Sequence, residues 1–401
     1  MTDHALQVSH PSTPRYSMLT AIFVWCALVV VSGLYVTLPM GPVLAGVFHV
    51  SPADAAWTSS AFSLAYALGF LVFGPLSDRF GRWPMMFFGL LALFIITPLL
   101  GLAPSLSVLV ALRALQGLAS ATFAPSVIAY VVERFPAERR VTAVGFISTG
   151  FLVSAIAGQL FSSAVSEYWG WNYVFYLHGG FVLISALLLG KLIPRGHAFH
   201  TKTGLAALYK QLPEVFLYKP LTLCYLICVT VLLSLVGMYT IFGSYLMKAP
   251  FELTAAQLLQ VRAMGLIGMV LSPFAGQLVA KFGMKTVLQA GLLLAAAGLG
   301  FIGFCTSLPV LIVVSILYIA GISVIIPTLI SLVGMLAGAR RGAAVTVYSL
   351  VLFIGASVGP LIALNALKTG SGLAAFEALA MLLLIAFGVS CFIRVSERTA
   401  H

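Results

Sequence analysis

Apolar runs of about 20 residues recur along the whole chain, and each is long enough to cross a bilayer as a helix. Lipid offers no hydrogen-bonding partners, so the backbone of each run must satisfy its own N–H and C=O groups within a helix. Only 8% of the residues are charged and 61% are hydrophobic, whereas about a quarter of a soluble domain is charged. The sequence therefore predicts an all-α membrane protein with twelve transmembrane helices, expected at 18–44, 56–77, 84–103, 107–131, 142–165, 172–193, 220–246, 255–279, 285–306, 309–335, 343–367 and 373–393.

Basic residues are distributed unevenly between the two sides of the predicted bundle. All but four of the 21 Lys and Arg fall on the side of the N-terminus; Lys248 and Lys368 fall on the other side, and Arg113 and Arg262 lie within spans. Cytoplasmic loops of membrane proteins are enriched in Lys and Arg. The net charge of +11 therefore indicates topology and not nucleic-acid binding, with both termini in the cytoplasm. The compact loops and the polar, uncleaved N-terminus favour a bacterial inner membrane.

A weak repeat relates the two halves of the chain. The segment GPLSDRFGRW at 74–83 aligns without a gap to GQLVAKFGMK at 276–285, and the same offset of 202 residues takes Pro125 to Pro327. Membrane transporters are commonly built from such repeats around a site at the bilayer midplane. We expect two pseudo-symmetric six-helix bundles at 18–193 and 220–393, a cytoplasmic linker at 194–219, and cytoplasmic tails at 1–17 and 394–401.

Three motifs resemble those of a known family. GPLSDRFGRW resembles the signature of the major facilitator superfamily between spans two and three. RALQG in span four, with Arg113, Gln116 and Gly117, resembles a second family motif, and WGWNYVF at 169–175 resembles the entry to span six in the twelve-span drug–proton antiporter branch. The resemblance implies a monomeric secondary transporter that moves a small organic solute by alternating access, with proton-coupled efflux as the leading expectation. Uptake or facilitated transport of an anionic metabolite is the alternative.

The signature loop ends span two on the side where span eleven begins. A helix N-terminus carries unpaired N–H groups and a partial positive charge, and Arg340 and Arg341 directly precede that of span eleven. We hypothesise that Asp78 reaches across the halves to this terminus and latches the cytoplasmic side shut, a role that the resemblance also implies. We call this contact the Asp78 latch.

The remaining residues of the loop have simpler expected roles. Gly74 and Gly81 permit a close approach and a tight turn. Arg79 and Arg82 are expected to pair with acids such as Glu133 or to hold lipid phosphates, and a purely topological role is the alternative for Arg79.

Ionisable residues within spans are costly and usually mark a functional site. Arg113 is a candidate for binding an anionic substrate or sensing a proton; the alternative is a structural Arg bonded to backbone carbonyls and Gln116. Arg262 in span eight fits a cavity or a snorkelling position at the rim equally well. His178 in span six titrates near neutral pH when unperturbed, although a lone histidine is more often a packing residue. Tyrosines near mid-span are further candidates for the cavity wall: Tyr35, Tyr66, Tyr239, Tyr318 and Tyr348.

The balance of charge within the spans argues against cation export. Spans one and four contain no Asp or Glu in their interior, which a proton–cation exchanger needs, so the cavity is expected to prefer neutral or anionic compounds. The antiporter motif GxxxGPxxGG of span five is also altered, because GFLVSAIAGQ at 150–159 keeps Gly150 and Gly158 as helix-packing positions but ends in Gln159.

Other classes of protein receive little support. Cys224 and Cys228 share a helix face, but buried thiols that pack as small apolar groups are favoured over a metal site. We find no HxxxD, DxxD or His cluster and no phosphate-cradling loop, so no enzyme, cofactor or metal is expected. The expected partners are the lipid bilayer, a small-molecule solute and protons; a sensor on a transporter scaffold is a remote alternative.

Overall fold

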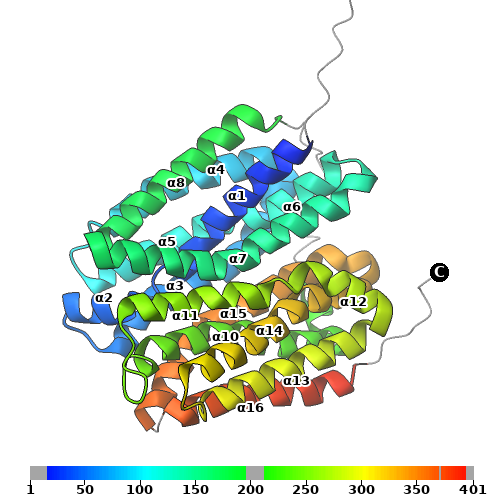
Figure 1. Cartoon of the computed structure of the whole chain (residues 1–401). Helices are drawn as coiled ribbons and strands as arrows, with labels where there is room; N and C mark the ends of the chain where they lie inside the picture. Colours follow the sequence, from blue (N-terminus) through cyan, green and yellow to red (C-terminus); the bar gives the residue numbers. More distant parts are fainter. Residues whose placement is uncertain (1–15, 196–211, 370–371, 394–401) are drawn as a thin grey trace, which may run out of the picture.

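The computed structural model describes residues 16–195, 212–369 and 372–393, and Figure 1 shows the helices packed in two layers, one for each half of the chain. Residues 1–15, 196–211 and 394–401, which include most of the predicted tails and linker, lie outside the described residues. The N-terminal half contains α1 (Tyr16–Tyr35), α2 (Gly41–Val47), α3 (Pro52–Phe80), α4 (Arg82–Leu100), α5 (Leu106–Ser120), α6 (Phe123–Arg134), α7 (Ala137–Trp169) and α8 (Trp171–Leu192). The C-terminal half contains α10 (Lys219–Tyr245), α11 (Ala255–Met269), α12 (Ala275–Phe282), α13 (Met284–Ile302), α14 (Leu308–Ala337), α15 (Arg341–Thr369) and α16 (Gly372–Cys391).

The predicted span at 255–279 is divided into short helices. Eleven helical segments in the described ranges are long and apolar enough to cross a membrane, and α5 and α6 together form one of them. The remaining predicted span, 255–279, consists of α11, a 3-10 turn at Ser272–Phe274 and the short α12. Proline in the turn lacks the N–H that would continue an α-helix. With this discontinuous span included, each half has six spans, as predicted.

The internal repeat is visible in the backbone. Gly81 separates α3 from α4 with φ 98° and ψ 147°, and Gly283 separates α12 from α13 with φ 82° and ψ 152°. Only glycine adopts this region readily. In both loops a basic residue also precedes a phenylalanine and lies over its ring. Arg79 lies 5.6 Å from the Phe80 ring centre, and Lys281 lies 5.2 Å from that of Phe282. The two halves are therefore built on one plan.

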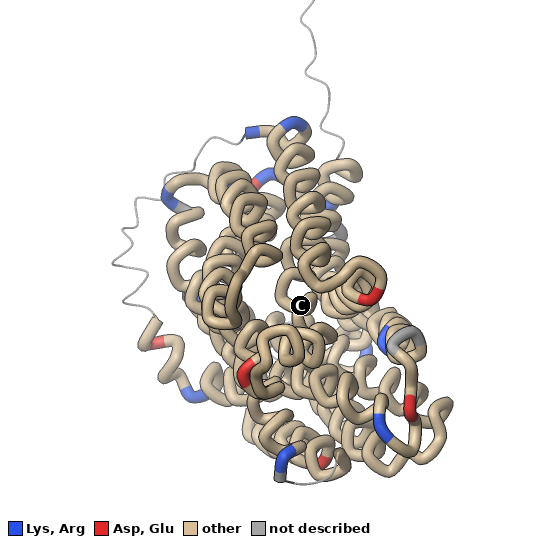
Figure 2. The backbone as a smooth tube through the Cα atoms, turned by 90° about the vertical axis from the view of Figure 1, so that its left-hand side faces the viewer, with Lys and Arg blue, Asp and Glu red and all other residues tan. Residues whose placement is uncertain are grey.

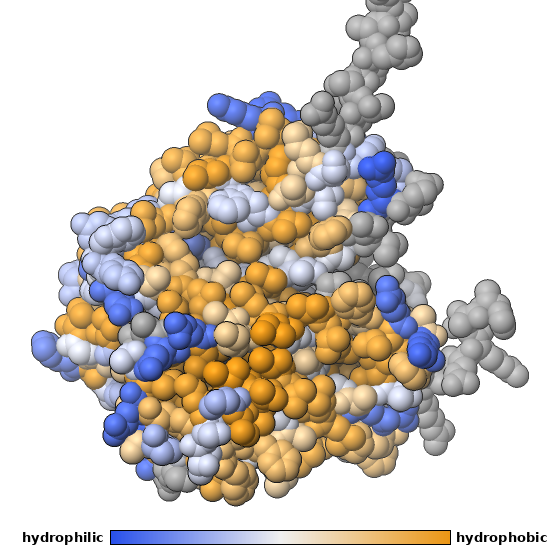
Figure 3. Space-filling view, viewed as in Figure 1, coloured by the Kyte–Doolittle hydropathy of each residue, from blue (hydrophilic) through white to orange (hydrophobic). Residues whose placement is uncertain are grey.

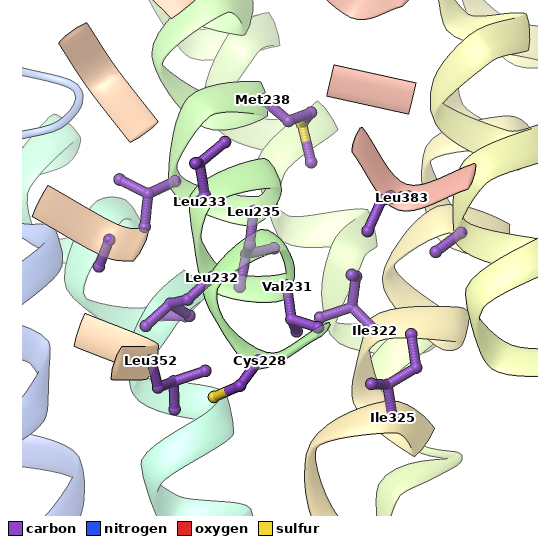
Figure 4. Packing of buried hydrophobic residues seen from close by; sticks show 14 of the residues in the cluster. Cys228, Val231, Leu232, Leu233, Leu235, Met238, Ile322, Ile325, Leu352 and Leu383 are labelled. Carbon is purple, nitrogen blue, oxygen red and sulfur yellow. The ribbon is translucent and has the colours of Figure 1, made fainter. Parts of the chain in front are cut away.

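The core of the C-terminal half is largely aliphatic, with buried aromatic side chains among the aliphatic ones. Figure 4 shows side chains of α10 packed against those of α14, α15 and α16, including Val231, Ile322, Leu352 and Leu383. Cys228 belongs to this cluster, and its thiol donates to the Tyr348 carbonyl. It packs as the small apolar group expected.

The outer surface is apolar around the middle of the molecule. Figure 3 shows a broad hydrophobic surface with hydrophilic residues gathered toward its two sides, and Figure 2 shows how few positions along the helices are charged. Such a belt faces lipid in a membrane protein. We call the end that carries Arg79, Arg82, Arg134, Lys281, Lys285 and Arg340 the basic end, and the end that carries Asp54, Glu167, Lys248 and Glu252 the far end.

Two long contacts join the halves. In the first, α3 runs antiparallel to α15, and Ser60 and Ser357 each donate a hydrogen bond to the other's carbonyl, at 2.6 and 2.9 Å. Toward mid-span the Phe353 ring packs on Tyr66 and Phe70, with ring centres 4.5 and 5.6 Å apart. In the second contact, α7 packs on α11, as Figure 1 shows. The halves therefore meet along α3–α15 and along α7–α11.

Candidate substrate site between the halves

Arg113 is buried in α5, and its hydrogen bonds all stay within the N-terminal half. Its Nε donates to the Thr58 carbonyl at 2.8 Å, and its Nη2 donates to Thr37 Oγ1 at 3.2 Å. Nη1 donates to the Gly33 carbonyl at 2.7 Å and to Gln116 Oε1 at 2.6 Å. All three nitrogens are therefore occupied by protein groups from α1, the turn that follows it, α3 and α5.

The neighbours of Arg113 are equally engaged. The guanidinium lies over the Phe62 ring, 4.4 Å from its centre. Gln116 Nε2 donates a hydrogen bond to Thr97 Oγ1 at 3.0 Å. A Cβ on Gly117 would overlap the Phe62 backbone. This geometry favours the structural alternative, in which Arg113, Gln116 and Gly117 fasten α5 to its neighbours.

Arg262 on α11 is as deeply buried as Arg113, but most of its donors are unpaired. Only 1% of the residue is exposed. Nη1 donates to Ser163 Oγ on α7, at 3.3 Å, whereas Nε and Nη2 have no partner among the described residues. These two nitrogens form the side edge of the guanidinium, which can bind a carboxylate with two parallel hydrogen bonds.

Arg262 lies at the interface of the two halves and not at the lipid-facing rim. Its Nη2 faces α10, where a Cβ on Gly243 would lie 3.5 Å away. Tyr239, one turn earlier on α10, directs its hydroxyl toward α11, against Gly265, which is one turn from Arg262. That hydroxyl is buried and has no described partner. The geometry therefore favours an interior position for Arg262, between the halves, over a snorkelling position at the rim.

The discontinuous span brings this group against α7. Gly265, next to Arg262 on one face of α11, has no side chain, and a Cβ there would lie 2.9 Å from both the Tyr239 hydroxyl and Ile156 Cδ1. The absent side chain lets the hydroxyl and α7 approach the backbone of α11. Unpaired polar groups from α10 and α11 thus converge on α7.

Gln159 on α7 adds an unpaired acceptor to this region. It is fully buried, its Nε2 donates to the Ala155 carbonyl at 2.6 Å, and its Oε1 has no partner in the described ranges. Helical periodicity places Gln159 between the face of α7 that contacts α1, near Gly158, and the face that contacts α11, near Ser163. Its position is therefore interior, toward the site.

His178 lies away from this site, between α8 and α1. Its Nε2 is 2.9 Å from the Val29 carbonyl and 3.2 Å from Ser32 Oγ. These contacts join two helices of the N-terminal half and favour a packing role.

The five candidate tyrosines are all buried but divide into two groups. Tyr318 donates to Ser234 Oγ at 3.1 Å and Tyr348 to the Ile326 carbonyl at 3.4 Å, both within the C-terminal half. Tyr66 packs on the Phe353 ring at the contact between the halves, and the Tyr239 hydroxyl lies against Gly265 of α11. Tyr239 is therefore the one of the five whose hydroxyl the geometry places against α11, one turn from Arg262.

At the basic end, the structure requires glycine at position 81 of the signature loop, whereas position 74 has room for a Cβ. A Cβ on Gly74 would lie 4.0 Å from Thr346 Oγ1 in the second turn of α15, and Gly81 has the positive φ given above. Arg82 donates to Ser77 Oγ at 2.6 Å and pairs with Glu133 at 3.0 Å, as expected. Arg79 is exposed and lies beside the Phe80 ring.

The Asp78 latch depends partly on side chains outside the described residues, namely those of Asp78 and Arg341. The backbone places residue 78 one turn beyond Gly74 on α3, and the antiparallel course of α3 and α15 brings that turn opposite the start of α15. Arg340 pairs with Glu214 at 3.1 Å in a solvent-exposed contact. The latch stays a prediction.

The two glycines retained in span five pack α7 against α1. A Cβ on Gly150 would lie 3.2 Å from the Val24 carbonyl, and one on Gly158 would lie 2.8 Å from the Ser32 carbonyl. Both positions therefore serve close helix packing.

Sequence reasoning singled out Arg262 and Tyr239 but missed Gln159 and Ser163 as site residues, and Ser60 and Ser357 as a contact between the halves. Gln159 did carry a signal, since it replaces a glycine of the span-five motif. Serines in an apolar helix carry none, because their hydroxyls usually bond within their own helix.

Similar proteins are bacterial membrane transporters. The chain is 28% identical over 269 residues to an uncharacterised transporter of Buchnera aphidicola, which covers 66% of this chain and 65% of that protein. It is 27% identical over 287 residues to the MFS-type transporter YybF of Bacillus subtilis, covering 71% of each. It is 27% identical over 277 residues to the inner membrane transport protein YnfM of Escherichia coli, covering 69% of this chain and 66% of that protein. The matches thus span about two thirds of the relatives' length.

Solved structures share the fold. The human organic anion transporter MFSD10 superposes with a TM-score of 0.76 at 17% identity, covering 94% of this chain and all of that one. A bacterial homologue of the human lysosomal transporter Spinster, in an inward-facing and occupied conformation, gives 0.75 at 18% identity, covering 96% of this chain and all of that one. Residues 23–270, more than half of the chain, match the Major Facilitator Superfamily. The protein belongs to this superfamily and is a multi-pass membrane transporter, not an enzyme.

Proposed function

We propose that the protein transports organic anions across the cytoplasmic membrane by alternating access, with Arg262 as the anchor for the anionic group. The observation that carries the proposal is the buried guanidinium of Arg262, whose Nε and Nη2 lack partners among the described residues. Leaving buried donors of a charged group unpaired costs about 1–3 kcal/mol or more. A ligand that accepts hydrogen bonds from them recovers this free energy on binding.

The contrast between the two buried arginines supports this assignment. In Arg113 the side edge of the guanidinium is filled by the Thr58 carbonyl and the Thr37 hydroxyl. In Arg262 the same edge has no partner among the described protein groups and faces Gly243. A structural arginine uses its donors within the protein, whereas a binding arginine keeps them for the ligand.

The charge of the spans supports an anion over a cation. Both ionised side chains deep within spans in the described ranges belong to arginines, Arg113 and Arg262. A cation placed beside Arg262 meets like charge in a medium of low dielectric constant, which is strongly unfavourable. Cationic drugs are therefore poor substrates under this proposal.

The proposed direction is export. The basic end is assigned to the cytoplasm because cytoplasmic loops are enriched in Lys and Arg. A bacterial membrane is negative inside, so one negative charge leaving the cell gains about 2.3 kcal/mol per 100 mV. Proton-coupled efflux, expected from the resemblance to drug–proton antiporters, adds to this driving force. A relative named multidrug resistance protein 3 of Bacillus subtilis, 31% identical over 134 residues, also favours export.

The two contacts between the halves support alternating access around this site. The Ser60–Ser357 pair lies about two turns from the start of α3 and therefore toward the far end, and Arg262 bonds to Ser163 across α7 and α11. Both contacts must separate for the site to open toward the far end. We propose that the protein works as a monomer, since each half of the site comes from the same chain.

The test is solute flux in proteoliposomes that contain purified protein, with the membrane potential and the pH gradient imposed separately. We expect saturable flux of organic anions, stimulated by a potential that drives anions outward, and no flux of lipophilic cations. Arg262→Lys keeps the charge but loses the planar fork, and its anion flux is expected to fall at least tenfold. Lys248→Ala is the control for loss of a basic residue at the far end.

Two results would contradict the proposal. Exchange of a lipophilic cation for protons at a rate equal to that of anions would show that the interior charge does not select the substrate. Anion flux unchanged in Arg262→Lys would show that the anchor lies elsewhere.

A further inference from the structure

The Arg262 site offers more than a positive charge, because its unpaired groups differ in hydrogen-bonding character. Nε and Nη2 of Arg262 are donors, the Tyr239 hydroxyl is a donor or an acceptor, and Gln159 Oε1 is an acceptor only. A ligand that satisfies all of them must present acceptors to Arg262 and a donor to Gln159. The site therefore constrains the chemical class of the ligand.

The acceptor side fits a planar carboxylate. Nε and Nη2 point in parallel from one edge of the guanidinium, and a carboxylate matches this fork with both of its oxygens. The bond from Nη1 to Ser163 Oγ, at 3.3 Å, uses the other edge and leaves this one open. The Tyr239 hydroxyl, which lies against Gly265 one turn from Arg262 on α11 and has no described partner, is available as a third donor to a carboxylate oxygen.

The orientation of the Gln159 amide is set by the protein. A backbone carbonyl accepts only, so the group 2.6 Å from the Ala155 carbonyl must be the amide nitrogen. The oxygen is thereby turned the other way and left without a described partner. Gln159 is one turn from Ser163, which contacts Arg262, and residues at this spacing are about 6 Å apart. A ligand held by Arg262 beside Ser163 therefore has its nearest substituents next to the turn of α7 that carries Gln159.

The donor is expected to be neutral. An ammonium group next to the carboxylate would lie beside the Arg262 guanidinium, with no described carboxylate of the protein to offset the repulsion. A hydroxyl or an amide N–H donates to Gln159 Oε1 without adding positive charge. This requirement separates hydroxy- and acylamino-carboxylates from amino acids.

We infer that the preferred substrates are carboxylates that carry a neutral hydrogen-bond donor, a hydroxyl or an amide N–H, close to the carboxylate. This inference rests on the proposed function and specifies it. Arg262 and Tyr239 hold the carboxylate, and Gln159 accepts from the neighbouring donor. Gln159 is thus a specificity-determining residue.

The experiment measures Kd by titration calorimetry on the purified full-length protein, with four probes that share a phenyl ring and differ only in the groups expected to face Arg262 and Gln159. Mandelate has both groups, phenylacetate lacks the hydroxyl, phenylglycine has an ammonium instead, and methyl mandelate lacks the charge. We expect mandelate to bind about tenfold more tightly than phenylacetate, the effect of one additional hydrogen bond. Phenylglycine and methyl mandelate are expected to bind more weakly than phenylacetate.

The variant Gln159→Leu keeps the size of the side chain and removes the acceptor. We expect its Kd for mandelate to rise to that for phenylacetate, while the Kd for phenylacetate stays within about twofold of wild type. The unchanged phenylacetate affinity serves as the control for folding. Arg262→Lys is expected to weaken both carboxylates by tenfold or more.

The outcomes separate this inference from the proposed function. If Arg262→Lys weakens both carboxylates but wild type binds mandelate and phenylacetate equally, the inference about Gln159 is overturned and the anion site stands. If the preference for mandelate persists in Gln159→Leu, the inference is also overturned. If Arg262→Lys leaves carboxylate binding unchanged, or no carboxylate binds at millimolar concentration, the proposed function itself is overturned.

Discussion

Ser60 and Ser357 bind each other's backbone across the two halves of the transporter. The Ser60 hydroxyl donates to the Ser357 carbonyl at 2.6 Å, and the Ser357 hydroxyl donates to the Ser60 carbonyl at 2.9 Å. Both residues are buried, so neither hydroxyl exchanges this bond for water while the contact holds. Reciprocal bonds of this kind bring α3 and α15 close together and leave room only for small side chains.

This pair is predicted to separate during each transport cycle. In Ser60→Cys/Ser357→Cys, with the exposed Cys391 changed to Ser, oxidation is expected to form a disulfide and to abolish flux, and reduction is expected to restore it. Each single cysteine variant is the control and should be insensitive to oxidant. Flux at the wild-type rate in fully cross-linked protein would mean that α3 and α15 do not part here.

The Asp78 latch is tested by removing one charge. Asp78→Asn is expected to insert normally but to transport about five- to thirtyfold more slowly, which corresponds to the loss of about 1–2 kcal/mol of attraction to a helix N-terminus. The measurement is initial flux divided by the amount of protein in the membrane. Glu377→Gln, which removes an exposed acid at the start of α16, is the matched control. Wild-type flux in Asp78→Asn would refute the latch.

Arg113 is predicted to contribute to the stability of the fold and not to carboxylate binding. Arg113→Lys cannot replace the bonds to Thr58, Gly33, Thr37 and Gln116, and breaking such a buried network costs about 3–5 kcal/mol. We expect a clear fall in the Tm of the purified variant, while any protein that remains folded keeps its Kd for phenylacetate. A wild-type Tm combined with lost binding would instead support the cavity role that the sequence suggested.

Gly243 provides a way to block the anion site without removing a binding group. A Cβ there would lie 3.5 Å from Arg262 Nη2, with no other described atom within 4 Å apart from near neighbours in the helix. Gly243→Val is therefore expected to weaken carboxylate binding about tenfold with little change in Tm. Gly180→Val on α8, where the space is open, is the control. Equal affinity in both variants would show that the anion does not occupy the edge next to α10.

The two repeat-related glycines are predicted to be equally sensitive. Gly81→Ala and Gly283→Ala force a side chain into a backbone region that only glycine adopts readily, at a cost of about 1–3 kcal/mol each. Both variants should lower Tm, whereas Gly276→Ala, in the exposed α12 with open space around it, should not. Loss of stability in only one of the pair would mean that the second loop relaxes.

Much of the architecture follows from local properties of the sequence. The length of each apolar run decides that it spans the membrane, and the offset between Gly81 and Gly283 reveals the repeat, because a backbone that needs positive φ selects glycine at both positions. The break in span eight was not foreseen. It follows from one proline among apolar residues, and proline within α3, α14 and α15 leaves those helices unbroken.

The roles of the two buried arginines could not be separated from the sequence. Both lie in apolar spans, and the motif around Arg113 made it the stronger candidate for binding substrate. Only the tertiary structure shows which donors are already used, because hydrogen-bond partners such as Gly33, Thr58 and Ser163 are distant in sequence. The number of spans and the repeat can be read from the sequence, because lipid requires each apolar segment to form a helix independently of the others. The anion site depends on how α7, α10 and α11 meet, since a donor stays unpaired only where no neighbouring helix supplies an acceptor.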